Sequence, residues 1–234
     1  HEAEAFTLFF GVPAQFDVPR AAQADIVVFI PGYTPGRFEI SEVVELPFMG
    51  DNPEFYAPIV DRFYRKELAK YGEFKGVYPL SFFVVAPGQI FNNKRPLRKM
   101  EDFAGLKIRS PQPSAHQALT LMGMVPVSKP VSEAYELLSS GVLDGTLMPP
   151  ESVSSFKLLD SLPYGTIVPG ALYNTILSLG INERKWKSLR AEDREAIMRI
   201  SGDVFARKVG AAYVKGDLAN WEAMRKANKS VETM

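Results

Sequence analysis

The chain has 234 residues, of which 46% are apolar and 23% are charged, an ordinary globular composition that suffices for one large domain or two small ones. Lysine plus arginine (27) equals aspartate plus glutamate (27), so no global field favours nucleic acid or an anionic membrane as a partner. Cysteine is absent, which excludes disulfides, thiolate metal sites and cysteine nucleophiles.

The apolar runs are short. None approaches the 18 or so residues that a membrane span needs, so no direct membrane insertion is expected. The start, His1-Glu2-Ala3-Glu4, has neither the basic region nor the apolar stretch of a signal peptide. The chain is therefore expected to be a mature or trimmed form, or else a cytoplasmic protein.

The first third of the chain alternates between apolar runs and helical patterns. Residues 6–10 predict a strand, residues 15–24 a short helix, and the β-branched run 26–30 a strand buried on both faces. A helix is predicted over 53–71, where large apolar residues recur at helical spacing, and a long strand over 77–86. The stretch 87–96 is rich in Gly, Pro and Asn and is the candidate domain crossing.

The same alternation continues beyond this crossing. A strand that ends on Arg109 follows a single helical turn, and Ser132 is predicted to N-cap a helix that ends at Gly141. The other predicted elements are helices over 114–122, 183–189 and 191–228, and strands over 125–127, 143–148 and 173–181. Gly202, Gly210 and Gly216 favour a bend in the last helix. Strands alternating with helices indicate an α/β fold with a mostly parallel sheet.

Enzymatic readings find little support. His116 is the only internal histidine and has no metal-ligand partner one helical turn away. Neither a nucleophile elbow, nor a phosphate loop, nor a dinucleotide fingerprint is present. No catalytic residue, metal site or cofactor is predicted. Two alternatives to a simple binding protein stay open. One is an α/β enzyme that anchors an organic acid on Arg109, which would need a general base. The other is a ligand-sensing domain of a larger receptor.

Arg109 is the most informative residue. A planar, permanently charged guanidinium at the end of a short strand can take a carboxylate through two parallel charge-assisted hydrogen bonds. On local grounds alone, a surface ion pair is as good an interpretation of Arg109. A turn explains Asp144-Gly145, and a loop charge explains Glu151.

The motifs become specific in combination. Asp-x-x-Gly-Leu-Lys-Ile-Arg over 102–109 is followed by Gly123, Pro126-Val127 and then Ser-Glu-x-Tyr-x-x-Leu-x-x-Gly-Val-Leu-Asp-Gly over 132–145. The segments 31–38 and 45–48, and Asn182-x-x-x-Trp186-x-x-Leu189, add to the pattern. In this order and spacing, nearly the whole chain resembles the solute-binding proteins of tripartite ATP-independent periplasmic (TRAP) transporters.

The resemblance implies a two-domain α/β clamshell with mostly parallel sheets and a long C-terminal helix. Domain I would comprise residues 1–87 plus 175–213, and domain II residues 88–174 plus 214–234, with the ligand cleft between them. Because the family fold begins with a further strand and helix, domain I is expected to lack them. The resemblance also implies a periplasmic, non-enzymatic monomer that closes around an organic acid and delivers it to TRAP membrane permease subunits.

Site residues follow from the resemblance one by one. Arg109 stands where the family grips the ligand carboxylate, and Met148 where many sialic-acid and dicarboxylate binders carry an asparagine. Val131 stands where sialic-acid binders carry a phenylalanine. A second arginine, usual before the loop that precedes Asp102, has no counterpart in residues 87–91.

The departures favour a monocarboxylate with an aromatic or apolar body, such as a 2-oxo or hydroxy acid, because a second buried carboxylate would lack a partner. Candidate pocket walls are Tyr33, Phe82, Phe91 and Met148, and candidate neutral hydrogen-bonding groups are Thr34, Gln89, Asn92 and Tyr173. The alternative is a C4-dicarboxylate, with a second cation supplied by Arg37, Lys94, Arg95 or Lys129.

Overall fold

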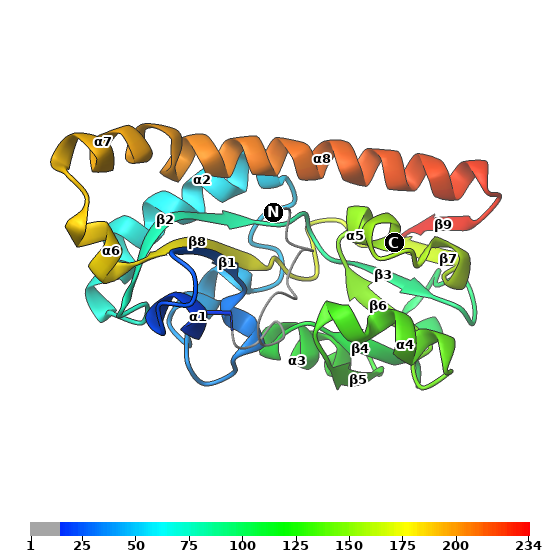
Figure 1. Ribbon diagram of the computed structural model, residues 1–234. Helices are drawn as coiled ribbons and strands as arrows, with labels where there is room; N and C mark the ends of the chain where they lie inside the picture. Colours follow the sequence, from blue (N-terminus) through cyan, green and yellow to red (C-terminus); the bar gives the residue numbers. More distant parts are fainter. Residues whose placement is uncertain (1–14) are drawn as a thin grey trace. The chain divides into compact units, whose positions relative to one another are not determined.

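The computed structural model describes residues 15–234, which form two compact units (Figure 1). Unit 1 comprises residues 15–44, Pro53–Val85 and Thr175–Ala211, and unit 2 comprises Glu45–Asn52, Ala86–Asn174 and Ala212–Met234. The expected domain I includes residues 45–52, whereas this segment packs with unit 2. The strand expected at residues 6–10 lies outside the described residues.

Unit 1 is built on a sheet in which β8 (Ile176–Asn182) lies between β1 (Ile26–Phe29) and β2 (Val77–Val84). Both pairings are antiparallel, which the sequence did not predict. The chain leaves unit 1 at the end of β2 and re-enters it just before β8, where the Val85 amide donates to the Thr175 carbonyl (3.1 Å). Because β2 leads out of unit 1 where β8 leads back in, the two neighbouring strands run in opposite directions.

The strand β1 is less buried than its β-branched sequence predicts. Ile26 is 51% exposed, whereas Phe29 at the other end of the strand is buried in an aromatic core. In that core Phe16 packs edge-on against Phe29 and against Phe38, with ring centroids 5.0 Å apart in both pairs. The short helix α1 (Asp17–Arg20) follows Phe16 directly and is all that forms of the helix predicted over 15–24.

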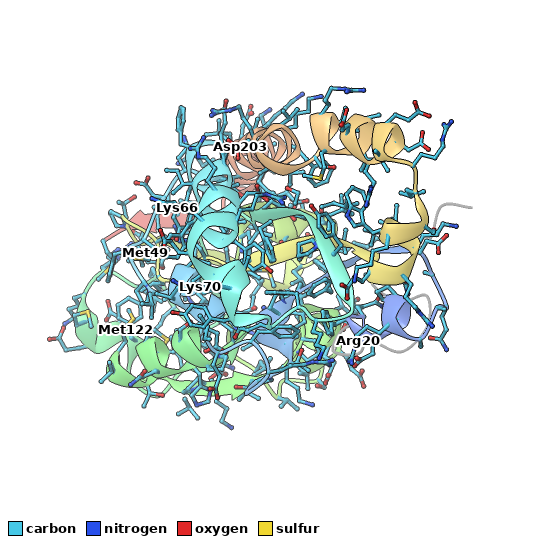
Figure 2. The ribbon with its side chains drawn as sticks, turned by 90° about the vertical axis from the view of Figure 1, so that its left-hand side faces the viewer. Arg20, Met49, Lys66, Lys70, Met122 and Asp203 are labelled. Atoms are coloured by element: carbon cyan, nitrogen blue, oxygen red, sulfur yellow. The ribbon has the colours of Figure 1, made fainter. Side chains whose placement is uncertain are left out.

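The helix predicted over 53–71 is confirmed as α2 (Pro53–Phe63), continued by a π turn (Tyr64–Leu68) and a 3-10 turn (Ala69–Tyr71). Lys66 and Lys70 lie on this continuation, as Figure 2 shows. Asp61 turns inward and its buried carboxylate accepts from the Phe82 amide (2.8 Å) and from Arg65 Nε (2.7 Å). The α2 helix is thereby fixed to β2.

The predicted C-terminal helix over 191–228 is present as α7 (Ala191–Ile200) and α8 (Gly202–Lys226), after α6 (Glu183–Ser188). The helix is interrupted at Gly202, whose φ of +57° favours glycine. Gly210, by contrast, lies within α8, where a Cβ would stand 2.3 Å from the Pro53 carbonyl oxygen. Glycine at position 210 therefore permits close packing and produces no break.

Unit 2 contains a six-stranded sheet in the order β5-β4-β6-β3-β7-β9. Three of its five described pairings are parallel, since β4 lies between two parallel neighbours and β7 pairs parallel with β9. The α/β class with a long C-terminal helix is confirmed. The strands are β3 (Gln89–Asn92), β4 (Lys107–Ser110), β5 (Val125–Ser128), β6 (Gly145–Met148), β7 (Tyr164–Ile167) and β9 (Ser230–Thr233).

Some unit 2 elements differ from the prediction. The candidate crossing 87–96 contains β3, so the chain passes between the units earlier, after Val85. Ser132 lies inside a 3-10 turn (Val131–Glu133) that leads into α4 (Ala134–Ser139), so it is not the N-cap of that helix. The helix α3 (Pro113–Leu121) matches its prediction, whereas α5 (Pro150–Ser155), β7 and β9 were not predicted.

Candidate functional site

The unit 2 sheet has two faces of different character. Ile90 of β3, Ile108 of β4 and Leu147 of β6 belong to one buried cluster, together with Leu119 of α3. We call this side the apolar face. Phe91 and Met148 belong to a second cluster, closed by α4, α5 and α8. Because successive residues of a strand point to opposite faces, Arg109 lies on this second side, which we call the Arg109 face.

Strand register supports this placement of Arg109. Its Cα partners are Val127 of β5 and Thr146 of β6, and Thr146 is in turn the partner of Phe91. Val127 packs against the same cluster as Phe91. These four residues therefore form a row across the sheet on one face.

Arg109 is 1% exposed, and main-chain carbonyls hold its guanidinium. Its Nε donates to the Lys129 carbonyl (2.7 Å) and its Nη1 to the Leu147 carbonyl (3.2 Å). Lys129 follows β5 and Leu147 lies near the end of β6, so the guanidinium is positioned at the carboxyl ends of parallel strands. In open α/β sheets, ligands bind beyond these strand ends. The two bonds fix the plane of a group suited to a carboxylate.

The surroundings of Arg109 are mainly apolar. Phe91 is fully buried and its ring stacks on Trp221 of α8, with centroids 5.2 Å apart. Met148 is fully buried in the same cluster, and Val131 packs against it partly buried. The structure thus brings Arg109, Phe91, Met148 and Val131 to one face. The Thr146 hydroxyl, which sequence analysis did not single out, is buried there without a hydrogen-bond partner.

Two other predicted site residues of unit 2, Gln89 and Tyr173, make contacts outside the cluster that contains Phe91 and Met148. Gln89 pairs with the main chain of Val168, whose amide donates to Gln89 Oε1 (2.6 Å) and whose carbonyl accepts from Nε2 (3.5 Å). Tyr173 belongs to the cluster of the apolar face. Its ring lies against Gly88, where a Cβ would stand 1.6 Å from a ring carbon.

The remaining candidates are placed as follows. Tyr33 and Thr34 belong to unit 1, where Tyr33 ends a 3-10 turn and the Thr34 amide donates to the Pro31 carbonyl (3.0 Å). Phe82 is fully buried in the unit 1 core, where the centroid of its ring lies 4.0 Å from that of the Tyr64 ring. Asn92 Oδ1 accepts from the amides of Lys94 and Arg95 (both 2.9 Å), so it shapes the turn after β3.

Four basic residues were considered as a second cation for a dicarboxylate, and each has other partners. Arg37 makes a two-bond pair with Asp17 (2.8 Å each). Lys94 pairs with Asp144 (3.3 Å), and Lys129 with Glu133 (2.8 Å). Arg95 donates to the carbonyls of Asp102 (2.9 Å) and Ala104 (2.8 Å).

The acidic motif residues serve local structure. Asp102 accepts from the amides of Arg98 (2.9 Å) and Lys99 (3.1 Å), and these bonds hold its pKa below the usual range. Asp144 accepts from the Lys107 amide (2.9 Å) at the amino end of β4.

The internal histidine has a neutral neighbour: His116 Nδ1 lies 3.0 Å from the Ser128 hydroxyl. Within residues 15–234, no group of three or more His, Asp or Glu side chains is placed to hold a metal ion.

Comparison with known proteins decides the family. The model of the bacterial extracellular solute-binding proteins, family 7, matches residues 10–231. The chain belongs to this family. The matching region includes every predicted site residue. None of the helices in the described part of the chain is both long and apolar enough to cross a bilayer.

Solved structures of TRAP periplasmic solute-binding proteins share the fold. One from Bordetella bronchiseptica, with bound (R)- and (S)-mandelate, is 32% identical with a TM-score of 0.92 and is matched over 97% of this chain and 72% of its own. One from Rhodoferax ferrireducens, in complex with copurified benzoate, is 29% identical with a TM-score of 0.90, over 96% and 70%. A marine metagenome protein, described as specific for aromatic acid ligands, holds 3-hydroxybenzoate; it is 29% identical with a TM-score of 0.90, over 97% and 71%.

Two curated relatives are matched over a smaller part of this chain. The outer membrane transporter protein TsaT of Comamonas testosteroni is 28% identical over 184 residues, 78% of this chain. The C4-dicarboxylate-binding periplasmic protein DctP of Rhodobacter capsulatus is 26% identical over 195 residues, 82% of this chain. The chain spans about half the length of these curated relatives, 54% of each.

Proposed function

We propose that this protein is a periplasmic solute-binding protein that captures an organic monocarboxylate with an aromatic or apolar body and delivers it, as a monomer, to a TRAP membrane permease. Arg109 carries the proposal. It is a buried guanidinium, oriented by two carbonyls at the carboxyl ends of parallel strands, on a face that also carries the apolar side chains of Phe91, Met148 and Val131. A carboxylate bound there gains charge-assisted hydrogen bonds, and its apolar body gains from burial.

The charge distribution supports a ligand with one carboxylate. A second buried carboxylate would cost several kcal/mol without a cation of its own. The four other basic residues considered for this role have acidic or main-chain partners. Gln89 is occupied by the main chain of Val168. The three structural relatives with aromatic monocarboxylates, each 29–32% identical to this chain, support the same ligand class.

A C4-dicarboxylate is the alternative, because a curated relative with that binding specificity is 26% identical over 82% of this chain. A calorimetric panel of mandelate, benzoate, succinate and malate separates the two. We expect mandelate or benzoate to bind at least about tenfold more tightly than succinate or malate, a difference of about 1.4 kcal/mol. Tighter binding of the C4-dicarboxylates would overturn the monocarboxylate proposal.

The alternative hypothesis, an enzyme acting on an organic acid, predicts that a bound acid is converted to product. Mandelate incubated with an equimolar amount of protein and recovered after denaturation should be unchanged by mass spectrometry. Conversion of the mandelate to a product would favour the enzyme instead.

A further inference from the structure

The helix α5 starts without a capping side chain of its own. It follows β6 after a single residue, Pro149, whose side chain offers no acceptor to the first turn. Pro150, the first helical residue, has no amide hydrogen. The first amide that needs an acceptor is that of Glu151, and it donates to Asp217 Oδ1 of α8 (2.8 Å). Asp217 therefore caps α5 from a different helix.

Two further contacts fix α5 to α8 beside this cap. At Gly216, next to Asp217, a Cβ would stand 2.5 Å from Glu151 Cγ, so the Glu151 side chain lies directly on the α8 backbone. Three residues further along each helix, the Ser154 hydroxyl donates to Asn220 Oδ1 (2.6 Å), and Asn220 is 1% exposed. The first turn of α5 thus docks on α8 through polar groups.

The electrostatics of this contact depend on pH. Burial raises the pKa of Asp217 to about 7, against the lowering effect of the Glu151 amide, and the Glu151 carboxylate raises it further. Glu151 is the ionisable group of α5 that faces Asp217, and its side chain also contacts the hydroxyls of Ser152 and Ser155. Burial at the docking contact penalises the ionised form of Asp217, and ionisation would also place two negative charges there, so docking favours the protonated form.

The same contact lies next to the residues that orient Arg109. The Leu147 carbonyl, which accepts from Arg109 Nη1, lies three residues before Pro150, the first residue of α5. Met148 is the last residue of β6 and contributes to the Arg109 face. A displacement of α5 would pull on this strand end.

We propose that Asp217 is a positioning residue for the Arg109 site, a pH-sensitive cap that holds α5 and the end of β6 in place when protonated and loosens them when ionised. The effect on the ligand rests on the proposed function, whereas the effect on α5 does not. Ligand affinity is then highest below neutral pH and falls as the pH rises through about 7.

Hydrogen exchange on the ligand-free protein tests the cap. Protection factors of the α5 amides, corrected for intrinsic exchange, should fall by about tenfold between pH 6 and pH 8, because one proton is linked to docking. Asp217→Asn keeps an acceptor oxygen but does not ionise, so its protection should be flat over this range. Asp160→Asn, on an exposed residue of the same unit, is the matched control and should behave as wild type. An equal fall in Asp217→Asn would overturn the proposal.

A second variant sharpens the test. Glu151→Gln should lower the pKa of Asp217 and so move the fall in protection to lower pH, because the variant lacks the facing negative charge. Removing it makes ionisation less disruptive, and the fall should also be smaller than in wild type. A fall as large as in wild type would show that charge repulsion does not drive the loosening.

Calorimetry with mandelate at pH 6 and pH 8 tests the link to the site. Wild type should bind several-fold more weakly at pH 8, and Asp217→Asn equally at both. Exchange that responds to pH while wild-type affinity stays constant would overturn the positioning role. If neither mandelate nor benzoate binds at any pH, the proposed function fails, and the exchange experiment alone decides on the cap.

Discussion

The two faces of the unit 2 sheet are built from the same strands, yet they differ in what they bury. The apolar face takes Ile90, Ile108 and Leu147 into a cluster of aliphatic and aromatic side chains. The Arg109 face takes their strand neighbours, among them a buried guanidinium and the unpartnered hydroxyl of Thr146. Polar groups of this kind reduce the stability gained from burial. We infer that the apolar face supports the fold and that the Arg109 face is adapted to a ligand.

The largest expected effect is on ligand binding at Arg109. Arg109→Ala should weaken mandelate binding by about 2–5 kcal/mol, roughly 30-fold or more, because the ligand carboxylate loses its charged partner. Arg109→Lys should also bind poorly, since a point charge does not reproduce the planar fork. Calorimetry measures both. An Ala variant within threefold of wild type would remove Arg109 from the site.

The neighbouring residue tests the opposite face. Ile108→Ala should lower the free energy of unfolding by about 2–5 kcal/mol, because Ile108 is fully buried and its truncation leaves a cavity. Mandelate affinity of the folded protein should stay within threefold of wild type. Urea unfolding and calorimetry on the same sample measure the two quantities. A large loss of affinity with little loss of stability would contradict the division between the faces.

Gln89 gives a smaller effect that distinguishes structure from binding. Gln89→Ala leaves the amide and carbonyl of Val168 without their side-chain partner, so stability should fall by about 1–3 kcal/mol. If Gln89 contacts the ligand, as the sequence suggested, affinity for mandelate should fall as well. We expect an effect on stability alone, measured by urea unfolding beside calorimetry.

The smallest predicted effect is the pH dependence of stability. The pKa of Asp217 is raised from 3.8 to about 7 in the folded protein, so its contribution is fully present below pH 4 and is lost as the pH rises through about 7. Wild type should therefore lose roughly 1.4 kcal/mol more between pH 6 and pH 8 than Asp217→Asn does. Urea unfolding at the two pH values checks the sign. A larger loss in the variant would contradict it.

Local sequence signals predicted the fold well where residues near each other in the chain decide the structure. The strand that ends on Arg109 and the helix after it lie where predicted, because an apolar run and helical spacing define them. β3 was missed because Pro87, Gly88 and two asparagines indicated a loop. Its pairing with β6 and β7, far away in the chain, overrides those residues. β7 and β9 likewise depend on each other.

The candidate site was predictable only in part. Arg109 stood out through its motif, and strand alternation then places Phe91 and Met148 on its face. The carbonyls that orient Arg109 belong to Lys129 and Leu147, and main-chain acceptors leave no sequence signal. The partners of Gln89 and of Arg37 lie 79 and 20 residues away, so their occupation could be learned only from the folded chain.

The contact between Gly88 and Tyr173 ties two positions of the sequence to each other. Any side chain at position 88 would begin 1.6 Å from the ring carbon that Tyr173 now places there. A side chain at position 88 therefore requires that position 173 no longer carries an aromatic ring. A substitution of Gly88 alone would make the protein fold poorly. Among functional variants of this protein, the two positions should be inherited as a pair.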